Sequence, residues 1–275
     1  MRSALEQFLN ASPWAGEQPE TEGPLLLLGC ERATLLRPAI ARLYERKGLM
    51  KITCYGHACF AAQVANRTLL FDPFISGNSL AKHIELKRVQ ADYILVSHGH
   101  EDHIADAVSI AKRTGATIIA NFEIAVWLGK QGCSKTHALN HGGACRFEFG
   151  RVKLVNAIHS SSLPDGAYGG NPGGFVIETG EGNFYYSGDT ALHSDMKLIG
   201  ETTDLNFAAL CIGDNFTMGV QDAIRAADFL RCPRVLGLHY NTFPPIQISE
   251  SAAVDQFKAA NKDLYLLAPG ESRVL

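Results

Sequence analysis

The sequence predicts a layered fold of the α/β or α+β class, in which two β-sheets carry helices on their outer faces. Two observations predict it. The 275 residues are 46% hydrophobic and 19% charged, a globular balance that can bury a large core and that excludes a disordered or coiled-coil chain. Short apolar or alternating runs, which are typical of strands, also recur in both halves of the chain with helical patterns among them.

The predicted elements begin immediately after Met50. In the first half, strands are predicted at Lys51–Tyr55, Thr68–Asp72, Tyr93–Ser97 and Ala116–Ala120, and helical spacing at Ile104–Lys112. In the second half, strands are predicted at Arg151–Ile158, Gly174–Glu178, Phe184–Ser187, Leu205–Ile212 and Val235–His239, and helices at Val220–Leu230 and Glu250–Ala260.

Residues 1–49 differ from the rest of the chain. A Glu-, Pro- and Gly-rich patch at Gly16–Pro24 precedes a predicted helix at about Glu31–Lys47, which Pro38 interrupts and which carries spaced arginines. A basic amphipathic helix most often docks on its own domain, but it can also bind a membrane surface or a partner. A third interpretation makes 1–49 an optional extension, since the strand pattern starts after Met50. The predicted organisation is therefore an N-terminal extension, 1–49, and one domain, 50–275.

Ionisable side chains concentrate in one loop directly after an apolar predicted strand. The segment Ser97–His103 reads Ser-His-Gly-His-Glu-Asp-His, a set of imidazoles and carboxylates that suits zinc and neighbouring divalent metals. His98 and His100, two residues apart on an extended segment, project to the same side and can share one metal. Asp102 and His103, at a turn into a helix, diverge from that pair and can reach a second metal. The helix N-terminus also favours the charge of Asp102.

Three further candidate ligands fall at the ends of later predicted strands. His159 and His239 close two apolar strands, and Asp189 follows a third strand in a turn that Gly188 permits. Together with the first four residues they make seven ligands, enough for two metals with positions left for water.

In this pattern the sequence resembles the metallo-β-lactamase superfamily. The resemblance covers roughly residues 50–275 and is specific, because all seven ligands occur in order: His98, His100, Asp102, His103, His159, Asp189 and His239. Other segments resemble a branch of uncharacterised metal-dependent hydrolases similar to ascorbate-6-phosphate lactonase and to the N-acylphosphatidylethanolamine phospholipases. These segments are Tyr55–Phe60, Phe71–Phe74, Gly188–Thr190, Gly213–Gly219 and His239–Pro244. The resemblance implies an α+β fold, a four-layer αββα sandwich with the metals at one edge of its two sheets.

The same resemblance implies how the ligands divide. One metal would be held by His98, His100 and His159, the other by Asp102, His103 and His239, with Asp189 bridging them. Two divalent cations about 3.5–4 Å apart, Zn²⁺ or alternatively Mn²⁺, can hold a bridging water and lower its pKa toward neutrality. The hydroxide then attacks a carbonyl carbon or phosphorus while a metal polarises the oxygen that gains charge. The predicted activity is hydrolysis of an ester-type bond, a lactone or phosphodiester, in a small molecule, with Asp102, Asp189 and His57 as the catalytic residues.

Two alternative functions remain open. A metal-dependent nuclease or phosphodiesterase would suit the same ligands. However, residues 50–275 carry no basic tract, and the net charge of −3 gives no bulk attraction for nucleic acid, so no nucleic-acid partner is expected. A non-catalytic metal-dependent binding or sensor protein would be expected to lose a ligand, and the sequence keeps all seven.

Several residues near the predicted ligands allow two interpretations each. His57 contacts substrate or protonates a leaving group, or it is a turn histidine hydrogen-bonded to backbone. Asp72 orients a ligand imidazole, or it is a turn residue at a strand end. Asp214 and Asn215 line the pocket, or they cap the helix that follows. The remaining histidines lack ligand context and are expected at the surface: His83, His137, His141 and His193.

The cysteines bear on the cellular compartment. They are seven, an odd number, widely scattered and without a CxxC pair, so a disulfide framework is disfavoured and a cytoplasmic location is expected. The sequence shows neither a membrane span nor a secretory signal, and it gives no indication of oligomeric state.

Overall fold

The computed structural model describes residues 50–275; the predicted N-terminal extension and its helix lie outside the described residues. Seven strands form the first sheet: β1 (Lys51–Gly56), β2 (Cys59–Val64), β3 (Arg67–Phe71), β4 (Tyr93–Leu95), β5 (Thr117–Asn121), β6 (Thr136–Leu139) and β14 (Ser272–Val274). Seven others form the second sheet: β7 (Ala144–Phe147), β8 (Gly150–Asn156), β9 (Gly173–Thr179), β10 (Gly182–Tyr186), β11 (Phe207–Cys211), β12 (Arg234–Leu238) and β13 (Asp263–Tyr265).

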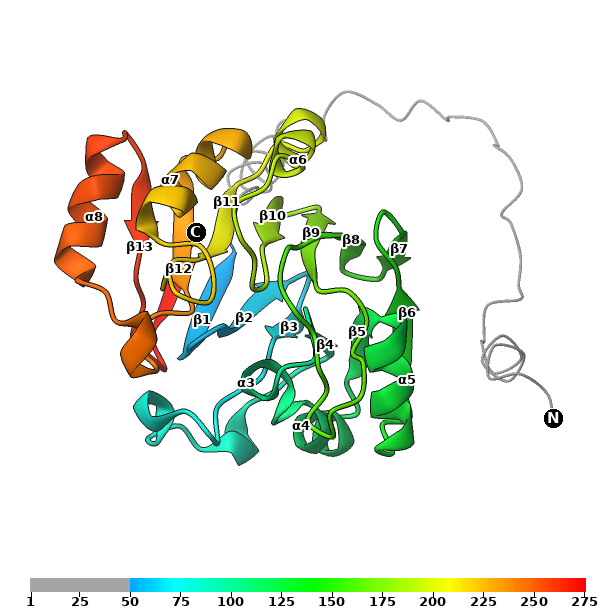
Figure 1. The fold of residues 1–275 in the computed structure, drawn as a ribbon. Coiled ribbons are helices and arrows are strands. Elements are labelled where there is room, and N and C mark those ends of the chain that lie inside the picture. Colours follow the sequence, from blue (N-terminus) through cyan, green and yellow to red (C-terminus); the bar gives the residue numbers. More distant parts are fainter. Residues whose placement is uncertain (1–49) are drawn as a thin grey trace, which may run out of the picture. The chain divides into compact units, whose positions relative to one another are not determined.

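Helices cover the outer face of each sheet (Figure 1). In chain order they are α3 (Glu101–Ile104), α4 (Ala107–Thr114), α5 (Phe122–Lys130), α6 (Met196–Thr202), α7 (Val220–Phe229) and α8 (Glu250–Ala259). Three 3₁₀ turns accompany them: η1 (Ser79–Ala81), η2 (Leu86–Arg88) and η3 (Pro244–Ile246). Buried side chains of α4 and α5 pack on the first sheet, and those of α6, α7 and α8 pack on the second. The predicted αββα sandwich is therefore confirmed.

The main core lies between the two sheets. Phe60 and Phe71 of the first sheet stack with ring centroids 4.4 Å apart, and Tyr186 of the second sheet meets both rings edge-on. Phe184 and Phe207 form a second stacked pair, at 4.9 Å. Each of these side chains is almost completely buried, so the aromatic pairs add to the hydrophobic stabilisation that holds the sheets together.

The strand directions bring the carboxyl ends of four strands from each sheet to one edge of the sandwich. In the first sheet β1, β3, β4 and β5 run parallel to one another, because β2 pairs antiparallel with both β1 and β3. In the second sheet β8 has the same direction as β10, β11 and β12, because β9 pairs antiparallel with β8 and β10. The backbone N–H of His239, just after β12, donates to the carbonyl of His57, just after β1, at 2.9 Å. The two sheets are thus joined where these strands end.

The predicted helix at Ile104–Lys112 is two helices rather than one. The chain breaks between α3 and α4 because Asp106 turns its carboxylate away from the helix, toward the backbone N–H groups of Ile75 and Ser76, at 2.6 and 2.9 Å. The helix α4 then ends at Gly115, whose φ of +74° suits glycine. The elements that the sequence did not predict are β2, β6, β7, β13, β14, α5 and α6.

The two ends of the described chain close the first sheet. Met50 and Leu275 are both fully buried, and each donates its backbone N–H to the other's carbonyl, at 2.9 and 3.0 Å. The six cysteines of residues 50–275 are free thiols. Within the same residues, no helix has the length and apolar character that crossing a bilayer would require.

Candidate metal centre

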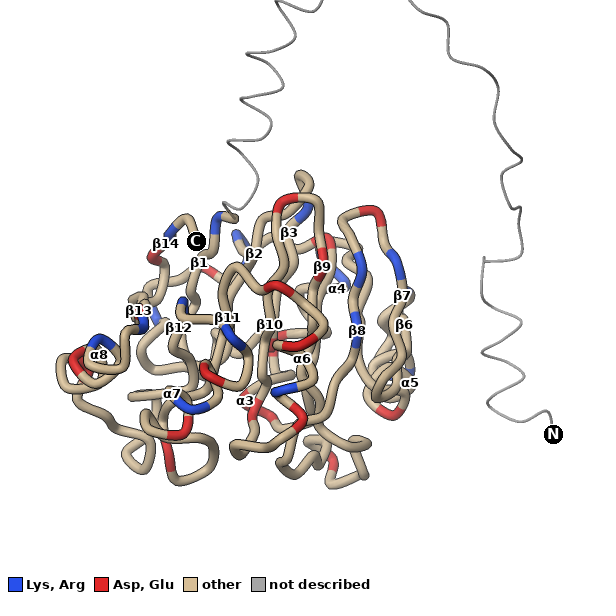
Figure 2. The backbone as a smooth tube through the Cα atoms, turned by 90° about the horizontal axis from the view of Figure 1, so that it is seen from above, with Lys and Arg blue, Asp and Glu red and all other residues tan. Residues whose placement is uncertain are grey.

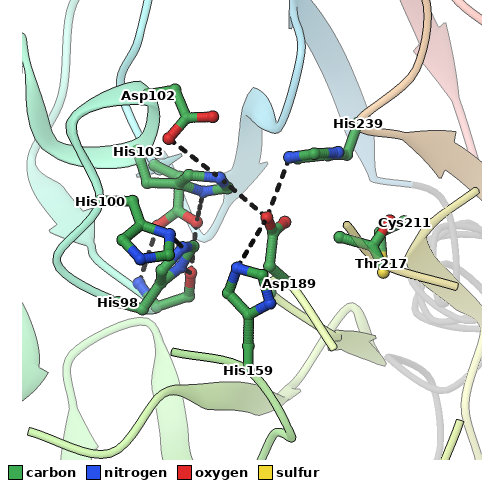
Figure 3. A network of polar contacts seen from close by, with 12 residues as sticks. His98, His100, Asp102, His103, His159, Asp189, Cys211, Thr217 and His239 are labelled. Carbon is green, nitrogen blue, oxygen red and sulfur yellow. Dashed lines mark hydrogen bonds and ion pairs between the residues drawn. The ribbon is translucent and has the colours of Figure 1, made fainter. Parts of the chain in front are cut away.

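The seven predicted ligands come together at the shared edge of the sheets (Figure 3). Ring nitrogens of His98, His100 and His159 lie within 4.8 Å of one another. Ligand atoms of Asp102, His103 and His239 lie within the same distance of one another, and His57 belongs to this second group as a fourth member. The structure therefore assembles the two sets of three that the resemblance implied.

Asp189 lies between the two groups. Its Oδ2 is 2.9 Å from His239 Nε2, 3.3 Å from His103 Nε2 and 3.7 Å from His159 Nε2. One carboxylate oxygen thus contacts imidazoles from both groups, which is the position of a bridging ligand.

The loop after β4 presents four of these side chains. His100 is the N-cap of α3, with an extended backbone (φ −63°, ψ 147°), so His98 and His100 precede the helix while Asp102 and His103 lie in its first turn. Gly99 fits between the two histidines because a Cβ there would lie 3.1 Å from the carbonyl oxygen of Ser162. The extended-then-helical backbone sends the two pairs in different directions, as the sequence spacing predicts.

Three residues whose side chains face the cluster have a left-handed backbone although they are not glycine. The φ angles are +55° at His57, +38° at Asp72 and +57° at His239. Such conformations cost free energy and concentrate at functional sites, where the surrounding contacts enforce them. Here each one turns the chain sharply after a strand, so that the side chain faces the cluster.

Asp72 fixes the orientation of His103. The buried Asp72 Oδ2 lies 2.7 Å from His103 Nδ1 and accepts a hydrogen bond from the Tyr186 hydroxyl at 2.6 Å, while Oδ1 accepts one from the Ser97 backbone N–H at 2.7 Å. A proton on His103 Nδ1 leaves Nε2 directed at Asp189, which is the arrangement of a metal-ligating histidine supported by a carboxylate. The structure thus supports the first interpretation of Asp72.

The electrostatics of the cluster favour a cation. Burial lowers the pKa of His98 well below its usual range, and it also lowers the pKa of His100 and His159, so these rings are neutral. Burial alone would raise the pKa of Asp189, but His103 and His239 outweigh it and hold that pKa well below normal. Burial alone would lower the pKa of His103, but Asp189 and Asp72 outweigh it and raise that pKa well above its usual range, so this ring would release a proton when a cation binds. An ionised carboxylate and three neutral imidazoles are already in the protonation states that bind metals.

Two atoms at the centre of the cluster lack hydrogen-bond partners among residues 50–275: His103 Nε2 and Asp189 Oδ1, both buried. A buried polar atom without a partner is costly, whereas a divalent cation would satisfy both. The donor set of imidazole nitrogens and carboxylate oxygens is also one that zinc accepts. The residues present therefore fit a metal centre.

The structure places His57 behind Asp102. Its Nε2 lies 3.0 Å from Asp102 Oδ2 and its Nδ1 lies 2.9 Å from the Thr242 hydroxyl. The side chain is fully buried beside the rings of Phe74 and Phe243, and burial lowers its pKa to about 4. The ring is therefore neutral. Both of its nitrogens contact side chains, so the interpretation as a turn histidine hydrogen-bonded to backbone does not hold.

Replacing His57 with phenylalanine is expected to weaken metal binding by about 10- to 100-fold, which is the usual loss when a group that supports a ligand is removed. The phenyl ring can pack beside Phe74 and Phe243, but Asp102 loses its donor. Because phenylalanine is strained at the φ of +55°, the free energy of unfolding is measured alongside. Competition with a chelator measures the affinity. Thr242→Val, which removes only the partner of Nδ1, is expected to cost less. Unchanged affinity with lost activity would instead assign His57 a direct role in proton transfer.

The structure excludes the helix-cap interpretation of Asp214 and Asn215. Asp214 and Asn215 do not cap α7, whose N-cap is Gly219; both are exposed with left-handed backbones, at φ +63° and +57°. Their loop packs against the cluster, because the Met218 N–H donates to the carbonyl that follows Asp189, that of Thr190, at 2.9 Å.

The surface position expected for His193 is wrong. The residue is only 8% exposed, because it packs in the turn that leads into α6.

Known proteins resemble this chain over nearly the whole described region. A family model described as a beta-lactamase superfamily domain matches residues 51–239. UPF0173 metal-dependent hydrolases of Flavobacterium johnsoniae and Christiangramia forsetii are 53% and 54% identical, each covering 81% of this chain and 99% of the relative. Among solved structures, Igni18, a metallo hydrolase from Ignicoccus hospitalis, is 33% identical with a TM-score of 0.75, covering 82% of this chain and 98% of that one.

Proposed function

This chain belongs to the metallo-β-lactamase superfamily and is a metal-dependent hydrolase, and from that premise we propose that it uses two metal ions to hydrolyse an ester-type bond of a small molecule. The observation that carries the proposal is the position of Asp189 Oδ2, which contacts His159 on one side and His103 and His239 on the other.

The proposed ligands divide as the geometry groups them. His98, His100 and His159 would hold one ion and Asp102, His103 and His239 the other, with Asp189 shared. Zinc is the proposed metal because imidazoles dominate the set, and manganese is the alternative. Divalent ions bound there would supply a nucleophilic water of lowered pKa and a Lewis acid for the oxygen that gains charge.

The protein's own side chains would position and move protons. Asp102 is the carboxylate that solvent and substrate can reach, since its side chain is 29% exposed against 3% for Asp189. Because His57 Nε2 is hydrogen-bonded to Asp102 Oδ2, we propose that the other oxygen, Oδ1, takes part in holding the metal and in accepting a proton during the reaction. Ser160 Oγ, 3.3 Å from His100 Nε2, holds the ring of that ligand in place.

Removing the metals is expected to lower the rate of hydrolysis by more than about 100-fold. Mutating a residue that only supports a metal ligand already lowers activity or metal affinity by about 10- to 100-fold. The assay uses the full chain, loaded with zinc or with manganese, on a panel of lactones and on bis(p-nitrophenyl) phosphate. Chelation should abolish turnover, and adding the metal back should restore it. Hydrolysis that survives chelation would exclude the proposal.

The same panel separates the alternatives. A phosphodiesterase would turn over the phosphate diester and leave the lactones intact. A binding or sensor protein would retain its metals and hydrolyse neither class.

A further inference from the structure

We infer that the substrate of this site is uncharged outside the bond that is hydrolysed: a neutral ester or lactone rather than one that carries a separate phosphate or carboxylate. The inference rests on the proposed function and adds a substrate class to it. Three features of the described chain carry it: the scarcity of lysine and arginine directly after the strand ends at the metal-bearing edge, the acidic groups there, and a neutral cavity beside His159.

The segments that build the metal-bearing edge contain neither lysine nor arginine. Within the described chain these are residues 56–58, 72–78, 96–106, 157–172, 187–195, 212–219 and 239–249, which directly follow the strand ends. The connection after β3 continues to residue 92, and in it the exposed Lys82 follows η1 and Lys87 and Arg88 lie on η2. Most lysines and arginines of the described chain lie on strands and helices, as on β7 and β8, whereas α3 is acidic (Figure 2). A site that recognises a phosphate or carboxylate normally matches it with these cations.

The exposed charges at this edge are negative. Glu101, Asp165 and Asp214 are all solvent-exposed in these segments, and α7, which begins there, carries Asp222 in its first turn. A carboxylate at that position opposes the attraction of a helix N-terminus for an anion. A second anionic group on the substrate, lying away from the metal ions, would therefore meet like charge, without a lysine or arginine in these segments to offset its desolvation.

The space next to the metal centre offers neutral hydrogen-bonding groups. A cavity of about 480 Å³ beside His159 is lined by residues 159–162, 166–168 and 170–172, and His159 itself is the one basic side chain among them. Ser160 and Ser162 bring exposed hydroxyls, and Asn171 brings an amide. Such groups recognise hydroxyl, carbonyl or amide substituents, which are uncharged.

An aromatic ring is held at the mouth of this cavity. Tyr168 is 66% exposed, and its hydroxyl donates to Asn171 Oδ1 at 2.8 Å. The loop is fixed from below by the Asn121 amide, which donates to the carbonyls of Gly169 and Asn171 at 2.7 and 3.1 Å. An exposed ring that is fixed in advance can contact an apolar or ring-shaped part of the substrate at little entropic cost.

A matched pair of esters tests the inference. p-Nitrophenyl butyrate and mono-p-nitrophenyl succinate share a leaving group, but the second ends in a carboxylate. With the metal-loaded full chain at low ionic strength, we expect kcat/KM to favour the neutral ester by at least about 10-fold. Added salt should raise only the rate for the anionic ester, because it screens repulsion. Equal or preferred turnover of the succinate overturns the inference. If the metal-loaded enzyme hydrolyses neither ester faster than the chelated enzyme does, the proposed function as an ester hydrolase is itself wrong.

Charge substitutions give a second, independent readout. Ser162→Lys adds a cation to the cavity and is expected to reduce the preference for the neutral ester by several-fold. Ser134→Lys adds the same charge before β6, at the opposite edge of the sheet, and should leave the ratio unchanged. Asp214→Asn removes an anion while keeping a residue that tolerates φ of +63°, and it should shift the ratio in the direction of Ser162→Lys. If the ratio of kcat/KM for the neutral ester to kcat/KM for the anionic ester is the same in the unmodified protein and in all three variants, the inference is contradicted.

Discussion

Asp189→Ala is expected to lower hydrolysis by more than about 100-fold and to reduce the bound metal from two ions to one or none. The side chain contacts imidazoles of both groups, so both ions would lose a ligand at once. The decrease in activity on losing a shared ligand should exceed the decrease of about 10- to 100-fold that is usual when a residue that only supports a ligand is removed. Elemental analysis of the purified protein and turnover of the lactone panel measure the two effects.

A control for Asp189→Ala is Asp204→Ala, which removes an exposed carboxylate outside the metal-bearing edge. It should keep both ions and full turnover. Two ions with normal activity in Asp189→Ala would show that this carboxylate is not shared, and the binuclear mechanism would have to be abandoned.

Asp72→Asn is expected to weaken metal binding by about 10- to 100-fold and to lower the free energy of unfolding. The amide keeps the size and the tolerance of the φ of +38°, but it cannot accept from all the donors that Asp72 now satisfies. Those donors include Tyr186 Oη and His103 Nδ1, and each one left unpaired costs about 1–3 kcal/mol. Urea denaturation measures the stability, and chelator competition measures the metal affinity.

Destabilisation alone must be separated from loss of the ligand's orientation. Leu70→Ala removes a fully buried side chain on the outer face of the first sheet, and it is expected to cost about 2–5 kcal/mol without changing metal affinity. Tyr186→Phe removes one donor to Asp72 and should have a smaller effect on both quantities. If Asp72→Asn loses stability but binds metal like Leu70→Ala, Asp72 only supports the fold.

The strands that carry the site were predictable from sequence for two reasons: β1 and β8 alternate between buried and more exposed side chains, and the others are buried on both faces over much of their length. The strands β4, β10, β11 and β12 read as apolar runs, and a polar residue or glycine follows each of them within two residues, where the chain leaves the sheet. The edge strands β6, β7, β13 and β14 were missed because they are short and partly exposed, so they show neither an apolar run nor a clear alternation. The break between α3 and α4 depends on Asp106 contacting a distant loop, which apolar spacing does not reveal.

The candidate site likewise contains residues that could be predicted from the sequence and residues that could not. Its seven metal-type side chains could be singled out because their residue type and their place after strands are local properties of the sequence. The groups that support them could not, because their partners are distant in the chain: Tyr186 reaches Asp72, and Thr242 reaches His57. Ser161, whose hydroxyl accepts from the Gly99 N–H at 3.1 Å, lies in a run of three serines that a sequence reader would regard as an ordinary loop.

The most direct test of the binuclear centre is an anomalous-scattering map at the zinc edge from crystals of the zinc-loaded protein. The account predicts two peaks about 3.5–4 Å apart, one within reach of His98, His100 and His159, the other within reach of Asp102, His103 and His239, with Asp189 between them. A single peak, or a second peak outside this cluster, would contradict it.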